Sequence, residues 1–201
     1  LSSAGHQPMS SYDKRYQIVY NGELYNYKEL KFELQRVIAK TGQQAYFFQT
    51  NSDTEVIIAA YARWGSDCVH HFNGMFAFAI WDTVTQQLFI ARDRMGIKPL
   101  YYLYTNGVFG FSSEIRTLMA AKLIPARLDE QGLIDYLRYQ TVHAPRTIIK
   151  GIKMLLPGHS ITIHNNDVKI HKYWQLHNTA VNPPVKTDYK EVCKDVNQLL
   201  T

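Results

Sequence analysis

Three consecutive residues, Asn21, Gly22 and Glu23, combine groups that can bind a polar substrate. An asparagine amide donates N–H groups, and a glycine lets its backbone N–H come close to a ligand. A glutamate carboxylate pairs with a cation. Together they predict an oxyanion hole beside a pocket for an amino acid. The competing interpretation is a turn, because Asn-Gly is also the commonest signal of a short hairpin.

A second polar cluster lies in residues 91–102, which read Ala-Arg-Asp-Arg-Met-Gly-Ile-Lys-Pro-Leu-Tyr-Tyr. Gly96 and Pro99 are turn formers, so we expect a charged loop between two strands. The simplest role for Arg92 and Asp93 is an ion pair at the end of a sheet.

Two amphipathic helices are predicted in the first third of the chain. The first spans residues 26–40, with Asn26 as its N-cap and Glu29 as the reciprocal capping partner. The second spans residues 53–64. Asp53 stands at its start, where the helix dipole favours a carboxylate, so a purely structural role competes with a role in binding.

Strands are predicted mainly in hairpin pairs, with helices in blocks between them. This order indicates an α+β fold with largely antiparallel sheet rather than a doubly wound fold. Residues 75–82 are apolar with alternating alanines, which is typical of a strand buried on both faces. The other predicted strands are residues 16–20, 46–49, 87–92, 100–104, 108–112, 160–164 and 168–174.

Size and composition indicate one packed domain with a short appendage, because the chain has 201 residues and is 46% hydrophobic. The net charge of +5 comes from scattered residues, so nucleic-acid binding is not expected. Neither a membrane span nor a signal peptide is predicted. Cys68 and Cys193 lie in unrelated contexts, which favours a reducing, cytoplasmic compartment over a disulfide framework. No metal-ligand spacing stands out.

Taken together, the motifs resemble the glutaminase domain of asparagine synthetases. Residues 91–102 resemble that family's Arg-Asp-x-x-Gly-x-Lys-Pro-Leu-Tyr-Tyr segment, and residues 20–27 resemble its Asn-Gly-Glu-Ile-Tyr-Asn-Tyr segment. The order and spacing of the matches make the resemblance specific. Further matching segments are residues 4–9, 52–55, 72–78, 112–115, 155–159 and 172–174.

The resemblance implies a class II glutamine amidotransferase domain with the N-terminal-nucleophile hydrolase fold. That fold is a four-layer αββα sandwich of two mainly antiparallel sheets, here expected to be truncated at the N-terminus. In such domains an N-terminal cysteine attacks the side-chain amide of L-glutamine, and its own α-amino group is the base. By resemblance, Asn21 and Gly22 donate to the oxyanion, and Glu23 and Asp53 bind the substrate's α-amino group.

The resemblance also implies a division of the chain. We expect an incomplete amidotransferase domain at residues 1–177, a linker at 178–187 and the start of a synthetase domain's first helix at 188–201. The amidotransferase domain needs no cofactor, whereas ATP and magnesium would serve the synthetase domain. The expected partners are L-glutamine and that synthetase domain, with a homodimer left open and with neither nucleic acid nor a membrane.

The sequence also departs from the family pattern. Leu1 stands first instead of a cysteine, and the family's His-Arg-Gly-Pro-Asp segment and the arginine for the substrate carboxylate are missing. We therefore expect an internal fragment of a longer enzyme, inactive by itself. Two alternatives stay open: an amidotransferase whose acceptor is not aspartate, and a catalytically silent module that binds glutamine or a partner.

Overall fold

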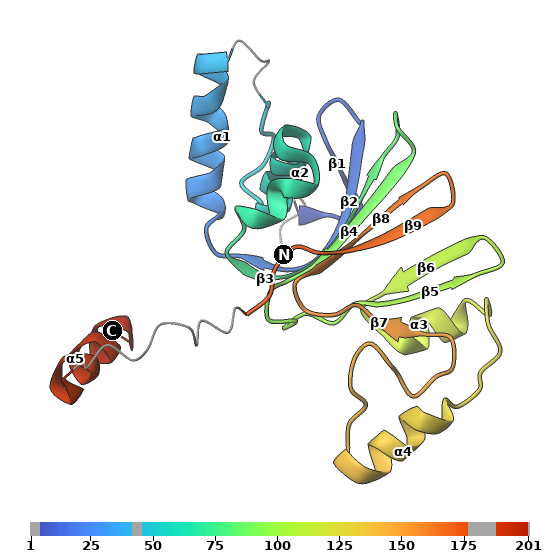
Figure 1. The fold of residues 1–201 in the computed structure, drawn as a ribbon. Helices are drawn as coiled ribbons and strands as arrows, with labels where there is room; N and C mark the ends of the chain where they lie inside the picture. The colour runs from blue at the N-terminus through green and yellow to red at the C-terminus, as the bar shows by residue number, and fades with distance from the viewer. Residues whose placement is uncertain (1–4, 42–45, 177–187, 201) are drawn as a thin grey trace.

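The computed structural model of the protein describes residues 5–41, 46–176 and 188–200. Two antiparallel sheets lie face to face, with strand orders β1-β2-β3-β4-β8-β9 and β6-β5-β7 (Figure 1). The larger sheet consists of β1 (Met9–Ser10), β2 (Tyr16–Leu24), β3 (Gly74–Asp82), β4 (Gln87–Arg92), β8 (His159–His164) and β9 (Asp167–Lys172). The smaller sheet consists of β5 (Tyr101–Thr105), β6 (Val108–Ser112) and β7 (Lys153–Met154).

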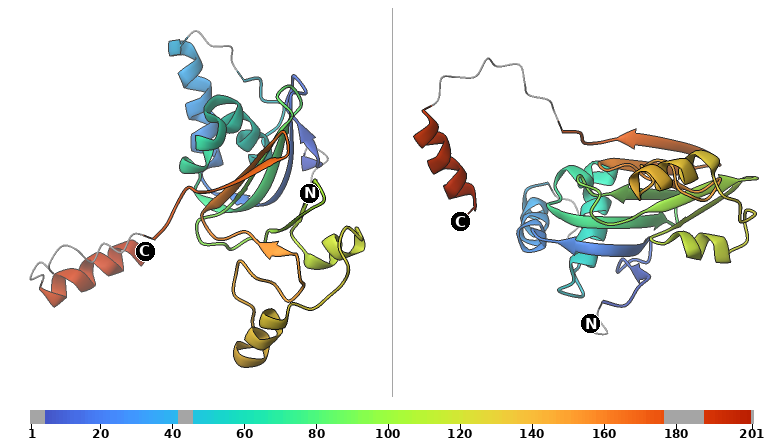
Figure 2. Two further views of the ribbon diagram at one scale, coloured as in Figure 1. Left: turned by 45° about the vertical axis from the view of Figure 1, so that its right-hand side comes forward. Right: turned by 90° about the horizontal axis from the view of Figure 1, so that it is seen from below.

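Helices cover the outer faces of both sheets (Figure 2). The helices are α1 (Tyr27–Thr41), α2 (Asp53–Trp64), the 3₁₀ helix η2 (Gly65–His70), α3 (Ile115–Ala120), α4 (Glu130–Tyr139) and α5 (Tyr189–Leu200). Helix α5 lies apart from the sandwich in both figures. In the part of the chain that the structure describes, no helix is both long and apolar enough to cross a membrane.

Alternation along β3 separates two hydrophobic cores. Phe76 and Phe78 pack with α1 and α2 on one face, whereas Ala77 and Ala79 face the smaller sheet on the other. The small alanine side chains let the two sheets approach each other. A third core, which includes Leu118 of α3, lies on the far side of the smaller sheet. The order helix, sheet, sheet, helix confirms the four-layer α+β sandwich and the outer position of the first two predicted helices.

The strand predicted at residues 16–20 is longer than expected. It does not end at Asn21 and Gly22, because β2 continues to Leu24 and pairs with β3 along its whole length. Gly22 pairs with Phe76, and Leu24 pairs with Gly74. Asn21-Gly22 is therefore part of a strand and not the hairpin turn that its dipeptide signal favours.

Two other local predictions are wrong because a side chain bonds elsewhere. The Asn26 carboxamide does not pair with Glu29 but bridges to the His71 carbonyl and the Asn73 N–H. Residues 46–49 form no strand. The N–H groups of Gln49 and Thr50 donate instead to the buried carboxylate of Glu55, at 2.7 and 2.6 Å.

The expected ion pair between Arg92 and Asp93 is also wrong, since no salt bridge joins them within the described residues. Both side chains are buried and bind backbone groups instead. The Arg92 guanidinium donates to three carbonyls, and burial lowers its pKa while the Asp93 charge opposes that shift. The Asp93 carboxylate accepts four N–H groups, among them that of Phe76 at 3.2 Å. This pair therefore fixes the loop 93–98 against β3.

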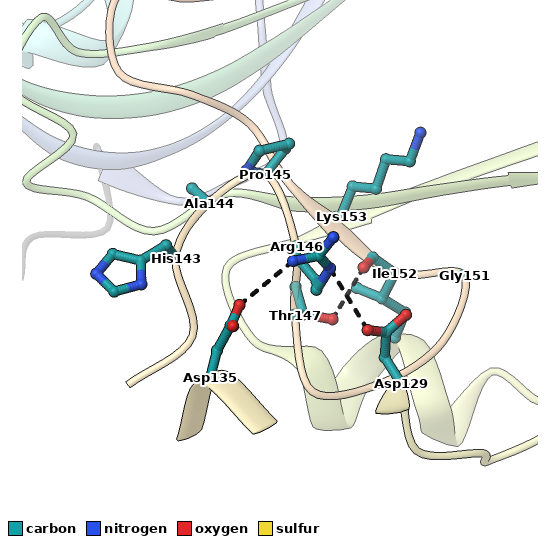
Figure 3. Close-up of a pocket in the computed structure, with 10 residues that line it drawn as sticks. All are labelled: Asp129, Asp135, His143, Ala144, Pro145, Arg146, Thr147, Gly151, Ile152 and Lys153. Carbon is teal, nitrogen blue, oxygen red and sulfur yellow. Dashed lines mark hydrogen bonds and ion pairs between the residues drawn. The ribbon is translucent and has the colours of Figure 1, made fainter. Parts of the chain in front are cut away.

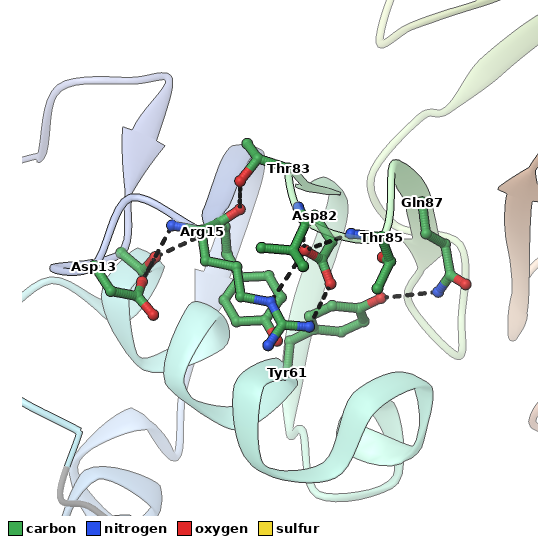
Figure 4. A network of polar contacts seen from close by, with 10 residues as sticks. Asp13, Arg15, Tyr61, Asp82, Thr83, Thr85 and Gln87 are labelled. Carbon is green, nitrogen blue, oxygen red and sulfur yellow. Dashed lines mark hydrogen bonds and ion pairs between the residues drawn. The ribbon is translucent and has the colours of Figure 1, made fainter.

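An ion pair closes the opposite end of the sheet, where β3 leaves its ladder with β2 (Figure 4). The Arg15 guanidinium donates to both oxygens of the buried Asp82 carboxylate, at 3.1 and 2.8 Å. The same carboxylate accepts the N–H groups of Val84 and Thr85. The hydrogen bond from Arg15 is the main cause that holds the pKa of Asp82 well below its usual range.

We expect Asp82→Asn to lower the free energy of unfolding by about 2 kcal/mol at neutral pH, the scale of hydrogen bonds to a charged group. Because the folded-state pKa is depressed, the carboxylate stabilises the fold fully above its unfolded-state pKa of about 4. That contribution is lost as the pH falls from there toward the folded-state pKa, so the difference between variant and wild type should shrink in acid. Urea denaturation at several pH values measures it, with the exposed Asp67→Asn as the control. A difference that did not change with pH would contradict the assignment.

Candidate active site

Three of the four predicted site residues lie on β2, and strand geometry separates their directions. Residues such as Ile18 and Leu24 point into the core beneath α1 and α2. Asn21 and Glu23 therefore point to the opposite face, toward the smaller sheet. The Asn21 Nδ2 atom donates to the Ser113 Oγ atom, at 3.1 Å, directly after β6. Asn21 thus sits where the two sheets meet.

The outer edge of β2 carries a row of N–H groups beyond the short pairing with β1. The Tyr20 N–H donates to the Gln7 Oε1 atom at 2.6 Å, and the Leu24 N–H donates to the Asp53 Oδ2 atom at 3.0 Å. Because N–H groups alternate in direction along a strand, that of Gly22 points to the same edge, between these two bonds. The predicted backbone donor is therefore oriented away from β3.

The fourth predicted residue, Asp53, is tied to this edge from the helix layer. It occupies the first turn of α2, as expected, but the N-cap is Ser52, whose Oγ atom accepts the Thr54 N–H. Besides the Leu24 N–H, the Asp53 Oδ2 atom accepts the Tyr20 hydroxyl at 3.0 Å. Burial first, and the Asp53 charge second, raise the pKa of Tyr20, so this hydroxyl remains a donor. Both bonds end on Oδ2, so a substrate cation would pair through Oδ1.

The β2 backbone sets the spacing of the groups along this edge. Gly22 and Leu24 are two residues apart, which is about 7 Å along an extended strand. The Gly22 N–H lies at one end of this span, and the Asp53 carboxylate, bound to the Leu24 N–H, lies at the other. The Asn21 side chain leaves β2 next to Gly22, on the face toward the smaller sheet.

A cavity of about 260 Å³ opens beside Asn21, between the two sheets. Its walls combine apolar residues of β3 and of the smaller sheet with a few polar groups. The lining residues are Gln7, Val19, Tyr20, Asn21, Ala77, Phe78, Ala79, Leu100, Phe111, Ser112 and Ser113. The small Ala77 and Ala79 side chains leave this space open. The same two alanines of β3 that face the smaller sheet therefore also shape the cavity.

A larger cavity, of about 400 Å³, lies between α4 and the loop before β7 and contains no predicted site residue (Figure 3). Arg146 contacts Asp129 at 3.5 Å and Asp135 at 3.3 Å, so its charge holds the loop on α4. Within residues 5–41, 46–176 and 188–200, no group of three or more His, Cys, Asp or Glu residues is arranged to hold a metal ion.

Neither cysteine lies among the site residues described above. Cys68, in η2, is fully buried, and burial raises the pKa of its thiol, so it is a poor nucleophile. Cys193 is exposed on α5, outside the sandwich. Neither cysteine therefore combines a reactive thiol with a place among these residues.

A four-layer sandwich of two antiparallel sheets between helix layers is the architecture of the N-terminal-nucleophile hydrolase fold. A family model described as "Glutamine amidotransferase domain" matches residues 1–174. The chain belongs to this family of glutamine amidotransferase domains. Its fold resembles that of a glutamine phosphoribosylpyrophosphate amidotransferase from Bacillus subtilis, with a TM-score of 0.57, 21% identity and coverage of 85% of this chain and 32% of that one.

Curated relatives are more similar in sequence. A glutamine-hydrolysing asparagine synthetase (number 3) of B. subtilis is 41% identical over 86% of this chain. The amidase chyE of Penicillium rubens is 35% identical over 88% of this chain. The matched regions cover 27% and 25% of those two proteins, so the chain spans about a quarter of their length.

Three contacts of the site are not apparent in the sequence. Gln7 closes the edge of β2, Tyr20 links β2 to Asp53, and Ser113 binds Asn21. Gln7 and Ser113 lie within segments that match the family, but their partners are 13 and 92 residues away. Sequence spacing cannot reveal such pairs, because only the sheet register brings them together.

We expect Gly22→Ala to destabilise the domain by about 1–3 kcal/mol, the usual range for overpacking. A Cβ atom on Gly22 would lie 2.2 Å from the Met75 carbonyl oxygen and 2.8 Å from the Phe76 Cα atom, and this backbone cannot move without opening the β2–β3 ladder. Urea denaturation measures the loss. Gly5→Ala is the matched control, since a Cβ there meets nothing within 4 Å. Equal stability of the two variants would show that the ladder is looser than described.

Proposed function

We propose that this domain hydrolyses the side-chain amide of L-glutamine and supplies ammonia within a longer, cytoplasmic asparagine synthetase. The observation that carries the proposal is the order of groups along β2. Asn21 and Gly22, which carry the donors, come just before Leu24, whose N–H donates to the Asp53 carboxylate. Family membership and the similarity to glutamine-hydrolysing asparagine synthetases support it.

In the proposed reaction, a cysteine at the mature N-terminus of the longer protein attacks the amide carbon of glutamine. Its α-amino group takes the thiol proton and passes a proton to the leaving nitrogen, which departs as ammonia. Water then cleaves the resulting thioester and releases glutamate. The negative charge that forms on the amide oxygen is stabilised by Asn21 Nδ2–H and Gly22 N–H.

The substrate's α-amino group is charged throughout this reaction. Asp53, through Oδ1, and Glu23 would bind it, so both belong to recognition rather than to the chemical step. The Tyr20 hydroxyl and the Leu24 N–H hold the Asp53 carboxylate in place. This arrangement would place the glutamine amide beside Asn21.

The ammonia would then react with aspartate that ATP has activated, in a synthetase domain outside residues 1–201. ATP and magnesium would bind to that domain. The predicted linker 178–187, which lies outside the described residues, and the helix from 188 would lead into it. The competing function is an amidotransferase with a different acceptor, which stays open because a relative that is not named an asparagine synthetase, the amidase chyE, is 35% identical over 88% of this chain. The full-length protein, incubated with glutamine, ATP, magnesium and aspartate, decides between them. Asparagine in the products supports the first function, and glutamate without asparagine supports the second.

We expect Asn21→Ala in the full-length protein to lower the glutaminase kcat by about 10²–10³-fold, as for other oxyanion-hole donors. The KM for glutamine should change little, because the oxyanion exists only in the transition state. Asn21→Asp, which keeps the size but loses the N–H donors, should be at least as slow. Steady-state ammonia release measures both. An Asn21→Ala variant with full kcat would rule out the oxyanion role.

Asp53→Asn should instead raise the KM for glutamine, with a smaller change in kcat, because its charge acts equally in the ground and transition states. The amide oxygen can still accept from Tyr20 and Leu24, and the Ser52 cap remains, so the variant should fold. Glu29→Gln is the control, since Glu29 is an exposed acid in the first turn of α1. An unchanged KM in a folded Asp53→Asn protein would leave Asp53 with a structural role only.

A further inference from the structure

The contact between Asn21 and Ser113 joins two separate sheets at the candidate site. Asn21 belongs to β2 of the larger sheet, and Ser113 directly follows β6 of the smaller sheet. The two side chains meet at 3.1 Å, and both line the cavity of about 260 Å³. The neighbouring Ser112 does not bond to Asn21, because its Oγ atom accepts the Glu114 N–H.

The bond matters because an asparagine carboxamide can rotate. A free carboxamide can present either its carbonyl oxygen or its NH₂ group to a substrate, and only the NH₂ group stabilises an oxyanion. When the Ser113 hydroxyl accepts one N–H, the Nδ2 atom is fixed and its second N–H stays available for the substrate. The bond to Ser113 therefore restricts rotation of the Asn21 side chain and holds its Nδ2 atom at the mouth of the cavity before the substrate arrives.

We propose that Ser113 is a positioning residue of the oxyanion hole, acting through Asn21 by holding its carboxamide between the two sheets. The inference rests on the proposed glutaminase function and adds a residue from the smaller sheet to it. Ser113 touches neither the substrate nor the nucleophile in this role. Its contribution is the preorganisation of a donor, which belongs to the chemical step and not to substrate binding.

The test is glutaminase kinetics of Ser113→Ala in the full-length protein. Loss of one hydrogen bond of ordinary strength corresponds to about 3- to 10-fold in rate, so kcat should fall by that factor. The KM for glutamine should stay within about twofold. Ser113→Thr keeps the hydroxyl and should recover most of kcat. A normal kcat in Ser113→Ala, or no recovery in Ser113→Thr, would overturn the proposal.

A double-mutant cycle separates positioning from a general structural role. In the Asn21→Ala background the carboxamide is gone, so adding Ser113→Ala should change kcat by less than about twofold. If Ser113→Ala lowered kcat by the same factor in both backgrounds, it would act independently of Asn21 and the proposal would fail. Wild-type protein without any glutaminase activity would refute the proposed function itself, which distinguishes the two failures.

Discussion

The nine-residue pairing of β2 with β3 is the constraint on which the candidate site depends. It keeps β2 extended through Asn21, Gly22 and Glu23, so that neighbouring groups point in fixed and different directions. Side chains at odd positions face the smaller sheet, and N–H groups at even positions face the outer edge. A turn at the same residues would point these donors elsewhere. The close contact at Gly22 explains why the strand needs glycine there, apart from any catalytic role.

The loop after β4 secures the far side of this pairing. Asp93 accepts the Phe76 N–H, and Phe76 is the residue that pairs with Gly22. A buried carboxylate is tolerated only when hydrogen bonds replace its lost hydration, and Asp93 has four of them. The most recognisable motif of the sequence therefore acts on β3, the strand whose pairing keeps the donor-bearing β2 extended.

The sequence predicted the elements whose signals are local. The hairpin of β5 and β6, the strand β4 and the start and end of α2 all follow from short-range periodicity and turn residues. It failed where a distant partner decides the outcome. Asn-Gly normally makes a turn, but the ladder with β3, more than 50 residues away, keeps it extended. Likewise Glu55 bonds to residues 49 and 50, and so takes the N–H groups that a strand would need.

For the candidate site, resemblance supplied the identities of Asn21, Gly22, Glu23 and Asp53, but no sequence pattern supplied their supports. Gln7 lies just before the edge strand β1, and Tyr20 is on the helix-facing side of β2. Ser113 directly follows β6 of the smaller sheet. Their relation to the site exists only once register and layer order are set. Local sequence thus identifies the chemical groups, whereas their preorganisation is a property of the assembled sandwich.

Cys68 offers a natural reporter of that assembly. Its thiol is fully buried in the helix-side core, where burial raises its pKa, and only a thiolate reacts readily with an alkylating reagent. Alkylation of Cys68 therefore has to wait until the helix-side core opens, so its rate follows the opening of the native domain. Cys193, exposed on α5, reacts without any opening and provides the reference within the same molecule. The rate of Cys68 alkylation relative to Cys193, followed by mass spectrometry of the wild-type chain, therefore measures how often the core opens.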